Sequence, residues 1–223
     1  LSSISDYIDK NKLSENEINK LIDLTINLIS SSPPLIQRAT FSLCNNMLDT
    51  IDFSTEILSN FSDNLINQLK PILSSAPDRS KALYDEAISL TRNILKVAGA
   101  DSFWKAFSCC FMDKSPNLKL VSLNFLYETL NIEDNFKTAS FIQSVFKLLR
   151  EKANQDIKKR AFDIAELLYV RNSNTVVKLL KKMFLFDADP IIEQIRKNLG
   201  EEYPNEGESY ATEDYISIND DSS

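Results

Sequence analysis

The sequence contains no histidine and very little glycine, and both shortages limit what the chain can be. Its 223 residues include three glycines, the residue on which phosphate cradles, bulges and tight sheet turns depend. Histidine is the commonest general base and the commonest nitrogen ligand of zinc. We therefore expect helices joined by short turns, and we expect neither an enzyme nor a metal site.

Long apolar runs and a cysteine framework are also missing. No run of about 18 apolar residues is present to cross a membrane, and no secretory signal is visible. The three cysteines, Cys44, Cys109 and Cys110, have no metal-ligand spacing. An odd number favours free thiols in a reducing compartment, and we interpret these thiols as buried core residues.

The negative charge of the chain is concentrated at its C-terminal end. The whole sequence has 32 acidic and 25 basic residues, a net charge of −7. Eight of the acids, and no Lys or Arg, fall between Glu201 and Ser223, so the remaining body carries 24 acids against 25 bases. Such a body lacks the excess of Lys and Arg that a nucleic-acid surface needs. We interpret residues 201–223, which have few large aliphatic side chains, as a disordered acidic tail.

An internal repeat organises the body of the chain. Four segments share an apolar helix, a polar turn, and a second helix that enters on an aliphatic residue with a small residue four positions later. The second helices begin with LIQRATFSL (35–43), LYDEAISLT (83–91), LKLVSLNFL (118–126) and IKKRAFDIA (157–165). Aligned, they form three columns: Leu35, Leu83, Leu118 and Ile157; Ala39, Ala87, Ser122 and Ala161; and Ser42, Leu90, Phe125 and Ile164. Positions i, i+4 and i+7 share one helix face, so the columns predict where neighbouring units meet.

The first helices and the spacing of the units indicate one architecture. Segments 17–29, 65–73, 102–112 and 141–150 carry broad apolar faces. The small-residue column advances by 48, 35 and 39 positions, and two helices per unit of about 40 residues are typical of HEAT repeats. We therefore predict an all-α, HEAT-repeat α-solenoid of about five repeats over residues 1–200. The alternative is an ordinary antiparallel bundle whose amphipathic helices resemble one another by chance.

The two ends of the predicted solenoid differ from its middle. A fifth unit, 174–186 followed by 189–199, lacks the small-residue column, as a terminal unit would. For its second helix we expect Asp189 as N-cap, Pro190 at the first position and Gly200 at the C-cap. Because the chain starts at Leu1 without Met, we interpret residues 1–11 as the second helix of a repeat truncated at the N-terminus.

Few residues could carry chemistry. Neighbouring acids such as Asp85 and Glu86 have no partner base in the sequence pattern, and we interpret them as solvated charge. There is no Gly-rich phosphate loop and no nucleophile elbow, so we expect no cofactor and no small-molecule substrate. Trp104 is close in sequence to Phe103 and Phe107, and packing in the core is favoured over stacking on a ligand.

The turns inside the units are the best candidates for a binding surface. In a stack of helical hairpins these turns emerge on one edge and form a continuous stripe. Each turn region contributes at least one basic residue, so we predict a locally basic stripe; the simpler interpretation is that these charges only solubilise the turns. The candidate partner-binding residues are Pro34, Gln37, Arg38, Arg79, Lys81, Lys114, Ser115, Asn117, Lys119, Lys158 and Lys159.

One long segment resembles a known family. The run LINQLKPILSSAPDRSKALYDEAISLTRNILKVAGADSFWKAFSCCFMDKSPNLKLVSLNFLYETL (65–130) is similar to the TOG-type HEAT domains of the CLASP family of microtubule regulators. The matching features are the helix around Leu69–Leu73, the turn Asp78–Lys81, Ala87 in the next helix, and the turn Lys114–Lys119. The resemblance covers about residues 20–170. It implies a cytoplasmic, cytoskeletal protein whose turn edge faces the acidic surface of tubulin through Arg38, Lys81, Lys114, Lys119 and Lys159.

Two further functions stay open. The chain could be a general HEAT-repeat scaffold for transport or complex assembly, like importin or adaptin segments, with contacts from the concave helix face. An enzyme is the least favoured, because no constellation of residues supplies a base, a nucleophile or a metal. We therefore expect a tubulin dimer or microtubule as the first partner, and no nucleic acid or membrane.

Overall fold

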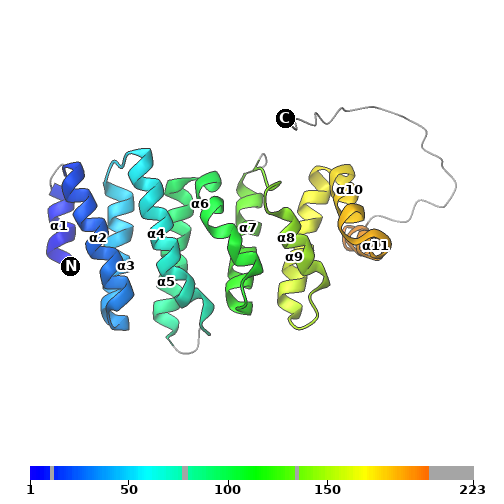
Figure 1. The fold of residues 1–223 in the computed structure, drawn as a ribbon, viewed down its shortest axis with the longest axis horizontal. Helices are drawn as coiled ribbons and strands as arrows, with labels where there is room; N and C mark the ends of the chain where they lie inside the picture. Colours follow the sequence, from blue (N-terminus) through cyan, green and yellow to red (C-terminus); the bar gives the residue numbers. More distant parts are fainter. Residues whose placement is uncertain (11–12, 77–79, 134–135, 201–223) are drawn as a thin grey trace, which may run out of the picture.

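The chain folds into helices alone over the part that the structure describes. The computed structural model describes residues 1–10, 13–76, 80–133 and 136–200, so Arg79 and the predicted acidic tail lie outside the described residues. Within these ranges the model contains α-helices and short 3₁₀ segments and no strand (Figure 1). The prediction of an all-α chain is confirmed.

The helices follow one another with short connections. In chain order they are α1 (Ser2–Lys10), α2 (Glu15–Ser31), α3 (Pro34–Thr50), α4 (Thr55–Ser74), α5 (Lys81–Ala98), α6 (Ala100–Phe107), η2 (Ser108–Met112), α7 (Pro116–Ile132), α8 (Ile142–Lys147), η3 (Leu148–Arg150), α9 (Gln155–Arg171), α10 (Ser173–Phe184), η4 (Leu185–Asp187) and α11 (Ala188–Asn198), where η marks a 3₁₀ helix. The predicted first helices 102–112 and 141–150 are therefore each an α-helix that tightens into 3₁₀ turns. None of the helices in the described ranges has the length and apolar character needed to span a membrane.

The helices pack in two rows that run along the molecule (Figure 1). One row contains α2, α4, α6, α8 and α10, and the other contains α3, α5, α7, α9 and α11. Contacts within the rows join α2 to α4, α4 to α6, α3 to α5, α7 to α9 and α9 to α11, and α1 packs on α3. Contacts between the rows join α2 to α3, α4 to α5, η2 to α7, η3 to α9 and α10 to α11. The connections consequently alternate between two long edges.

Small residues lie where neighbouring helices meet in the later units, as the columns predict. Ala87, Ser122 and Ala161 are fully buried on α5, α7 and α9. A small side chain at such a position lets the adjacent helix approach closely, because little volume separates the two backbones. The columns therefore identify the core face of these three helices correctly.

The predicted columns are wrong in the first unit. Leu35 is 75% exposed and Ala39 is exposed, whereas Thr40 and Leu43 are buried. The core face of α3 is therefore shifted by one residue, and Thr40 takes the place predicted for Ala39. Its hydroxyl donates to the carbonyl of Ile36 at 2.8 Å, which satisfies the polar group inside the core.

An aromatic cluster packs α6 against η2, α7 and the segment that precedes α8. Trp104 of α6 is 2% exposed, which confirms its predicted place in the core. Its ring stacks on Phe111 and Phe141, with centroids 5.5 and 5.6 Å apart. The indole Nε1 donates to the Thr129 hydroxyl of α7 at 3.2 Å, so the one polar atom of the ring is satisfied.

Long polar side chains bridge α5 and α7. The guanidinium of Arg92 donates to both carboxylate oxygens of Glu128, at 3.1 and 3.0 Å. The same guanidinium lies over the Phe125 ring, 5.5 Å from its centroid. Direct helix packing joins α3 to α5 and α7 to α9, so this bridge supplements a looser contact in the middle of the row.

The last helix ends as predicted but begins differently. α11 starts at Ala188 directly after η4, with Asp187 at the N-cap position, so the prediction of Asp189 as N-cap is wrong. Asp189 lies instead in the first turn, where its charge still favours the helix dipole. Gly200 has a φ of +73° and donates its N–H to the carbonyl of Lys197, which ends the helix as expected of glycine.

The cysteines do not share one environment. Cys44 and Cys110 are buried, and burial raises the pKa of each thiol to about 12. Cys109 is exposed, with its Sγ 3.3 Å from the ammonium of Lys70, so the prediction that it fills the core is wrong. The 3₁₀ geometry of η2 explains the difference, because adjacent residues on the segment point in different directions.

Candidate protein-binding edge

The candidate residues come from turns that lie along one edge of the molecule. In Figure 1 the C-terminal ends of α2, α4, η2 and η3 and the N-terminal ends of α3, α5, α7 and α9 are gathered at the lower edge. Contacts link each turn to the next. Arg38 pairs with Glu86 at 2.7 Å, the Ser115 hydroxyl donates to the Ser74 carbonyl at 2.9 Å, and Lys119 acts electrostatically on Glu151. We call this side of the molecule the turn edge.

The first turn is apolar where it meets solvent. Pro34 opens α3 and is exposed, followed by the exposed Leu35. Gln37 points inward instead, and its side-chain nitrogen donates to the Ile29 carbonyl at the end of α2, at 2.7 Å. Gln37 therefore holds the turn together, while Pro34 and Leu35 are available to a partner.

Arg38 is engaged within the chain. Its Nε and Nη2 both donate to Oε1 of Glu86, at 2.9 and 2.7 Å, and this joins α3 to α5. Hydrogen bonding to Glu86, followed by attraction to its charge, raises the pKa of the Arg38 guanidinium. The interpretation of Glu86 as solvated charge is wrong, since Oε1 is paired with Arg38 and Oε2 is buried. Most of the charge of Arg38 is consequently neutralised before any partner arrives.

The second and third turns present free lysines. Lys81 is the first residue of α5 and is exposed, and Lys114 is exposed between η2 and α7. Asn117 and Lys119 are half-buried in the first turns of α7. The ammonium groups of these lysines form no ion pair with any described residue.

Ser115 is occupied by the fold. Its hydroxyl oxygen accepts the N–H of Leu118 at 3.3 Å, which caps the N-terminus of α7. The same hydroxyl donates to the Ser74 carbonyl, so it also ties the third turn to the second. Its backbone N–H donates to Oδ1 of Asp113 at 2.7 Å. This residue therefore positions the lysines beside it, with little of its own side chain left to offer.

The fourth turn is the most basic of the four. Lys152 and Lys159 are exposed and Lys158 is half-buried, and none of the three forms an ion pair within the described part of the chain. The neighbouring acid, Glu151, accepts the N–H groups of Lys152 and Ala153 at 3.0 Å. These backbone contacts, with the Lys119 ammonium acting in the same direction, lower the pKa of the Glu151 carboxyl. The Glu151 carboxylate is thus directed at the backbone of the turn, while Lys152, Lys159 and the second acid of this turn, Asp156, are exposed.

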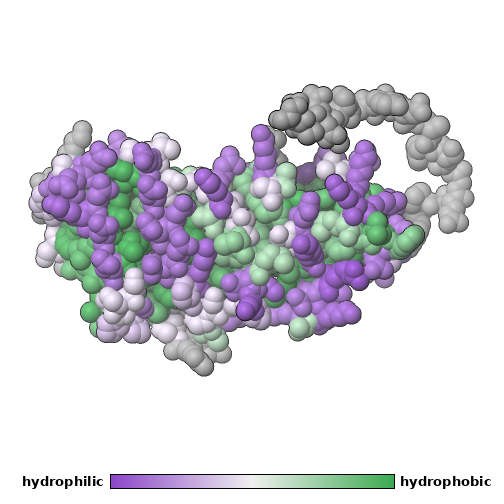
Figure 2. All heavy atoms as spheres, in the orientation of Figure 1, coloured by the Kyte–Doolittle hydropathy of each residue, from purple (hydrophilic) through white to green (hydrophobic). Residues whose placement is uncertain are grey.

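The character of the turn edge changes along its length. Figure 2 shows green and pale spheres at the left end of the lower edge, below α3, and mostly purple spheres at the right end, below α9. Among the described residues, the cations on it without an ion-pair partner are Lys81, Lys114, Lys119, Lys152, Lys158 and Lys159. A partner would therefore meet an apolar contact at one end and positive charge along the rest.

Sequence patterns missed two residues of this edge. The repeat columns predict Leu35 in the core, whereas the structure leaves both Leu35 and the adjacent Ile36 exposed. Lys152 was left out because it precedes the predicted helix start. Its place in the turn between η3 and α9 is the signal that identifies it.

No protein-family model matches the chain, and a comparison with curated proteins finds no match either. The residues of the turn edge are therefore assigned from their geometry and charge in this structure. The resemblance to TOG-type domains depends on patterned positions over about residues 20–170, without one diagnostic motif.

Proposed function

We propose that the chain is a protein-binding module whose turn edge docks on an acidic protein surface, with a tubulin dimer as the first candidate. The observation that carries the proposal is the row of three adjacent turns, the second to the fourth, that bear six lysines without an ion-pair partner among the described residues. The body has almost as many acids as bases, so this concentration of unpaired cations is local. The proposed role is one of binding rather than catalysis.

We further propose that the architecture is a HEAT-type α-solenoid. Two rows of helices, in which α2–α4, α4–α6 and α8–α10 pack together in one row and α3–α5, α7–α9 and α9–α11 in the other, support this proposal. So does the buried small-residue column on α5, α7 and α9. A stack of this kind holds its turns at fixed spacing, and a rigid row of contacts loses little entropy on binding.

The two kinds of residue on the edge would contribute in different ways. Exposed lysines facing carboxylates mainly accelerate association and set orientation, and their contribution falls with salt. Burying the exposed Leu35 side chain would contribute about 1–2 kcal/mol, independently of salt. The edge thus combines steering charges with one apolar anchor.

A fourfold substitution tests the proposal. Changing Lys81, Lys114, Lys119 and Lys159 to Ala should abolish co-elution with purified tubulin in size-exclusion chromatography, while circular dichroism shows that the helices are kept. The matched control changes four exposed lysines that lie off the edge, Lys96, Lys105, Lys147 and Lys178, and should still co-elute. Unchanged co-elution of the edge variant, or equal loss in both variants, would remove the proposal.

One observation favours a second candidate, a general scaffold that binds peptides away from the turn edge. A largely apolar cavity of about 620 Å³ lies between α8, α9 and α10, with Phe136, Ile142, Phe146, Val176 and Leu179 in its lining. In this case the edge substitutions would be silent in a pull-down from cell extract. Val176→Asp, at the cavity wall, would then remove the captured proteins.

A further inference from the structure

A second basic surface lies where α9 faces α11. The groove between these helices encloses about 800 Å³. One face of α9 lines it along its length, through Gln155, Lys158, Lys159, Phe162, Asp163 and Glu166. These positions recur at helical spacing, so α9 turns a continuous stripe toward a gap that no described segment fills. We call this the α9–α11 groove.

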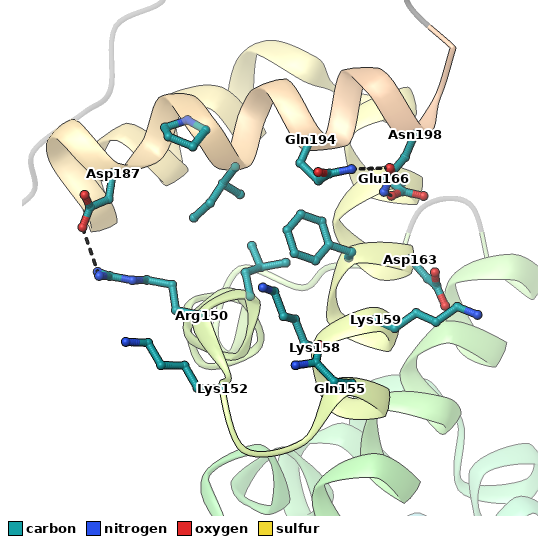
Figure 3. A pocket seen from close by; sticks show the side chains of 14 residues that line it. Arg150, Lys152, Gln155, Lys158, Lys159, Asp163, Glu166, Asp187, Gln194 and Asn198 are labelled. Atoms are coloured by element: carbon teal, nitrogen blue, oxygen red, sulfur yellow. Dashed lines mark hydrogen bonds and ion pairs between the residues drawn. The ribbon is translucent and has the colours of Figure 1, made fainter.

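The floor of the α9–α11 groove is apolar. Leu149 from η3, Phe162 from α9, and Pro190 and Ile191 from α11 lie there. Figure 3 shows the ammonium of Lys158 directed toward the middle of the groove. An occupant would therefore need apolar side chains as well as negative charge.

The charges of the groove are unevenly matched. Asp187 is paired with Arg150 at 3.0 Å, Asp163 is paired with Arg160 at 3.2 Å, and Glu166 accepts a hydrogen bond from Asn198. Lys152, Lys158 and Lys159 also line the groove and have no ion-pair partner among the described residues. The Asn198 amide is neutral, so Glu166 also keeps its charge at the far end of the groove, but the three lysines outnumber it and are concentrated at the end near the fourth turn.

The chain delivers an acidic segment to the opposite end of this groove. Asn198, the last residue of α11, lines the groove and donates to Glu166, and Gly200 then ends the helix. The next residues, EEYPNEGESY (201–210), contain four acids and no Lys or Arg. The sequence from 201 to 223 therefore has the charge that the groove lacks.

The distances allow this segment to reach the lysines. From Glu166 back to Gln155, α9 spans about 17 Å at a rise of about 1.5 Å per residue. An extended chain covers that length in about five residues. Starting beside Asn198, it would place Tyr203 over the apolar floor and Glu206 and Glu208 beside the lysines.

We propose that residues 201–208 bind the α9–α11 groove of their own chain, with Tyr203 on the apolar floor and Glu206 and Glu208 paired to Lys158, Lys159 and Lys152. Tethering makes a weak contact sufficient, because the segment meets the groove at an effective concentration in the mM range. Lys158 and Lys159 also belong to the turn edge. The segment would compete there with an acidic partner, a consequence that depends on the proposed function, whereas the intramolecular contact itself does not.

Carbodiimide coupling of the full-length chain tests the contact directly, since this reagent joins a carboxylate to an amine only when the two already touch. Mass spectrometry of the monomeric fraction should find Lys158 or Lys159 joined to Glu206 or Glu208. The yield should be at least about fivefold above that for Lys178 and Lys182, exposed lysines of α10 outside the groove lining, and should fall in about 0.5 M salt.

Equal yields at the groove and α10 lysines would overturn the proposal, as would coupling confined to dimers, which would indicate a second copy. A second test by NMR spectroscopy does not depend on the efficiency of carbodiimide coupling. In the full chain, the double variant E206Q/E208Q should shift the backbone amide resonances of residues 155–166 and 188–198 and leave those of α3 unchanged. Absence of shifts along α9 and α11 would equally contradict the contact.

Discussion

The first and fourth turns of the turn edge occupy equivalent places in the fold and differ in chemistry. The first presents Pro34 and Leu35 to solvent, and its one cation, Arg38, is bound to Glu86. The fourth presents Lys152, Lys158 and Lys159 without ion-pair partners among the described residues, and one of its two acids, Glu151, is held by backbone N–H groups. Position along the same edge therefore does not determine what a turn can offer.

The difference follows from how each turn is used by the fold. Arg38 and Glu86 connect α3 to α5, so their charges contribute to the packing of the row. The lysines of the fourth turn lie beside the α9–α11 groove, where no described acid forms an ion pair with them. A basic residue in a turn is available to a partner only when the neighbouring helix has not already paired it.

The largest expected effect comes from the basic end. Replacing Lys152, Lys158 and Lys159 by Gln should weaken binding to tubulin by about 30-fold at low salt, because three exposed pairs contribute about 0.2–1 kcal/mol each and their combined field also steers association. Fluorescence anisotropy over a salt series should show a flatter slope for the variant. An unchanged slope would mean that these lysines do not face the partner.

A substitution at the apolar end of the turn edge should weaken binding less and should leave its salt dependence unchanged. Leu35→Ser should weaken the same binding by about 10-fold, as expected for one aliphatic side chain removed from an interface, with no change in the salt slope. Ile132→Ser is the matched control, because Ile132 is 81% exposed at the end of α7, away from the turn edge. An equal loss of affinity in the two variants would indicate non-specific hydrophobic association.

Arg38 should have the smallest effect on binding. Arg38→Gln should change the affinity by less than about twofold, because the guanidinium is already paired. It should lower the thermal midpoint instead, since the Glu86 carboxylate with its buried Oε2 loses its partner. The double variant with Glu86→Gln should restore part of that midpoint. A large loss of affinity at unchanged stability would place Arg38 in the interface after all.

The helices were predictable from the sequence because their apolar periodicity extends over many residues. The core face of α3 was not, since Leu35 and Ile36 fit two registers equally well at the sequence level. In the structure neither of them is buried, and packing instead buries Thr40, whose hydroxyl donates to the Ile36 carbonyl of the same helix. The start of α11 was missed for a related reason, because η4 continues directly into it and makes a cap unnecessary.

The residues of the turn edge were predictable from the sequence, but the partners that some of their side chains bind within the chain were not. The spacing of the turns indicated Lys81, Lys114 and Lys159 as exposed, and they are. The engagement of Arg38 with a residue 48 positions away, and of Ser115 with a carbonyl 41 positions away, depends on how the helices stack. Such long-range partners follow from three-dimensional packing and leave no mark in local sequence.

The central claim is that the turn edge binds an acidic protein surface, and size-exclusion chromatography of the unmodified chain with purified tubulin tests it most directly. At about 50 mM salt the two proteins should elute together, and at about 300 mM the complex should largely dissociate, because exposed charges are screened over a shorter distance. Separate elution at both salt concentrations would contradict the account, and so would a complex of equal strength at both.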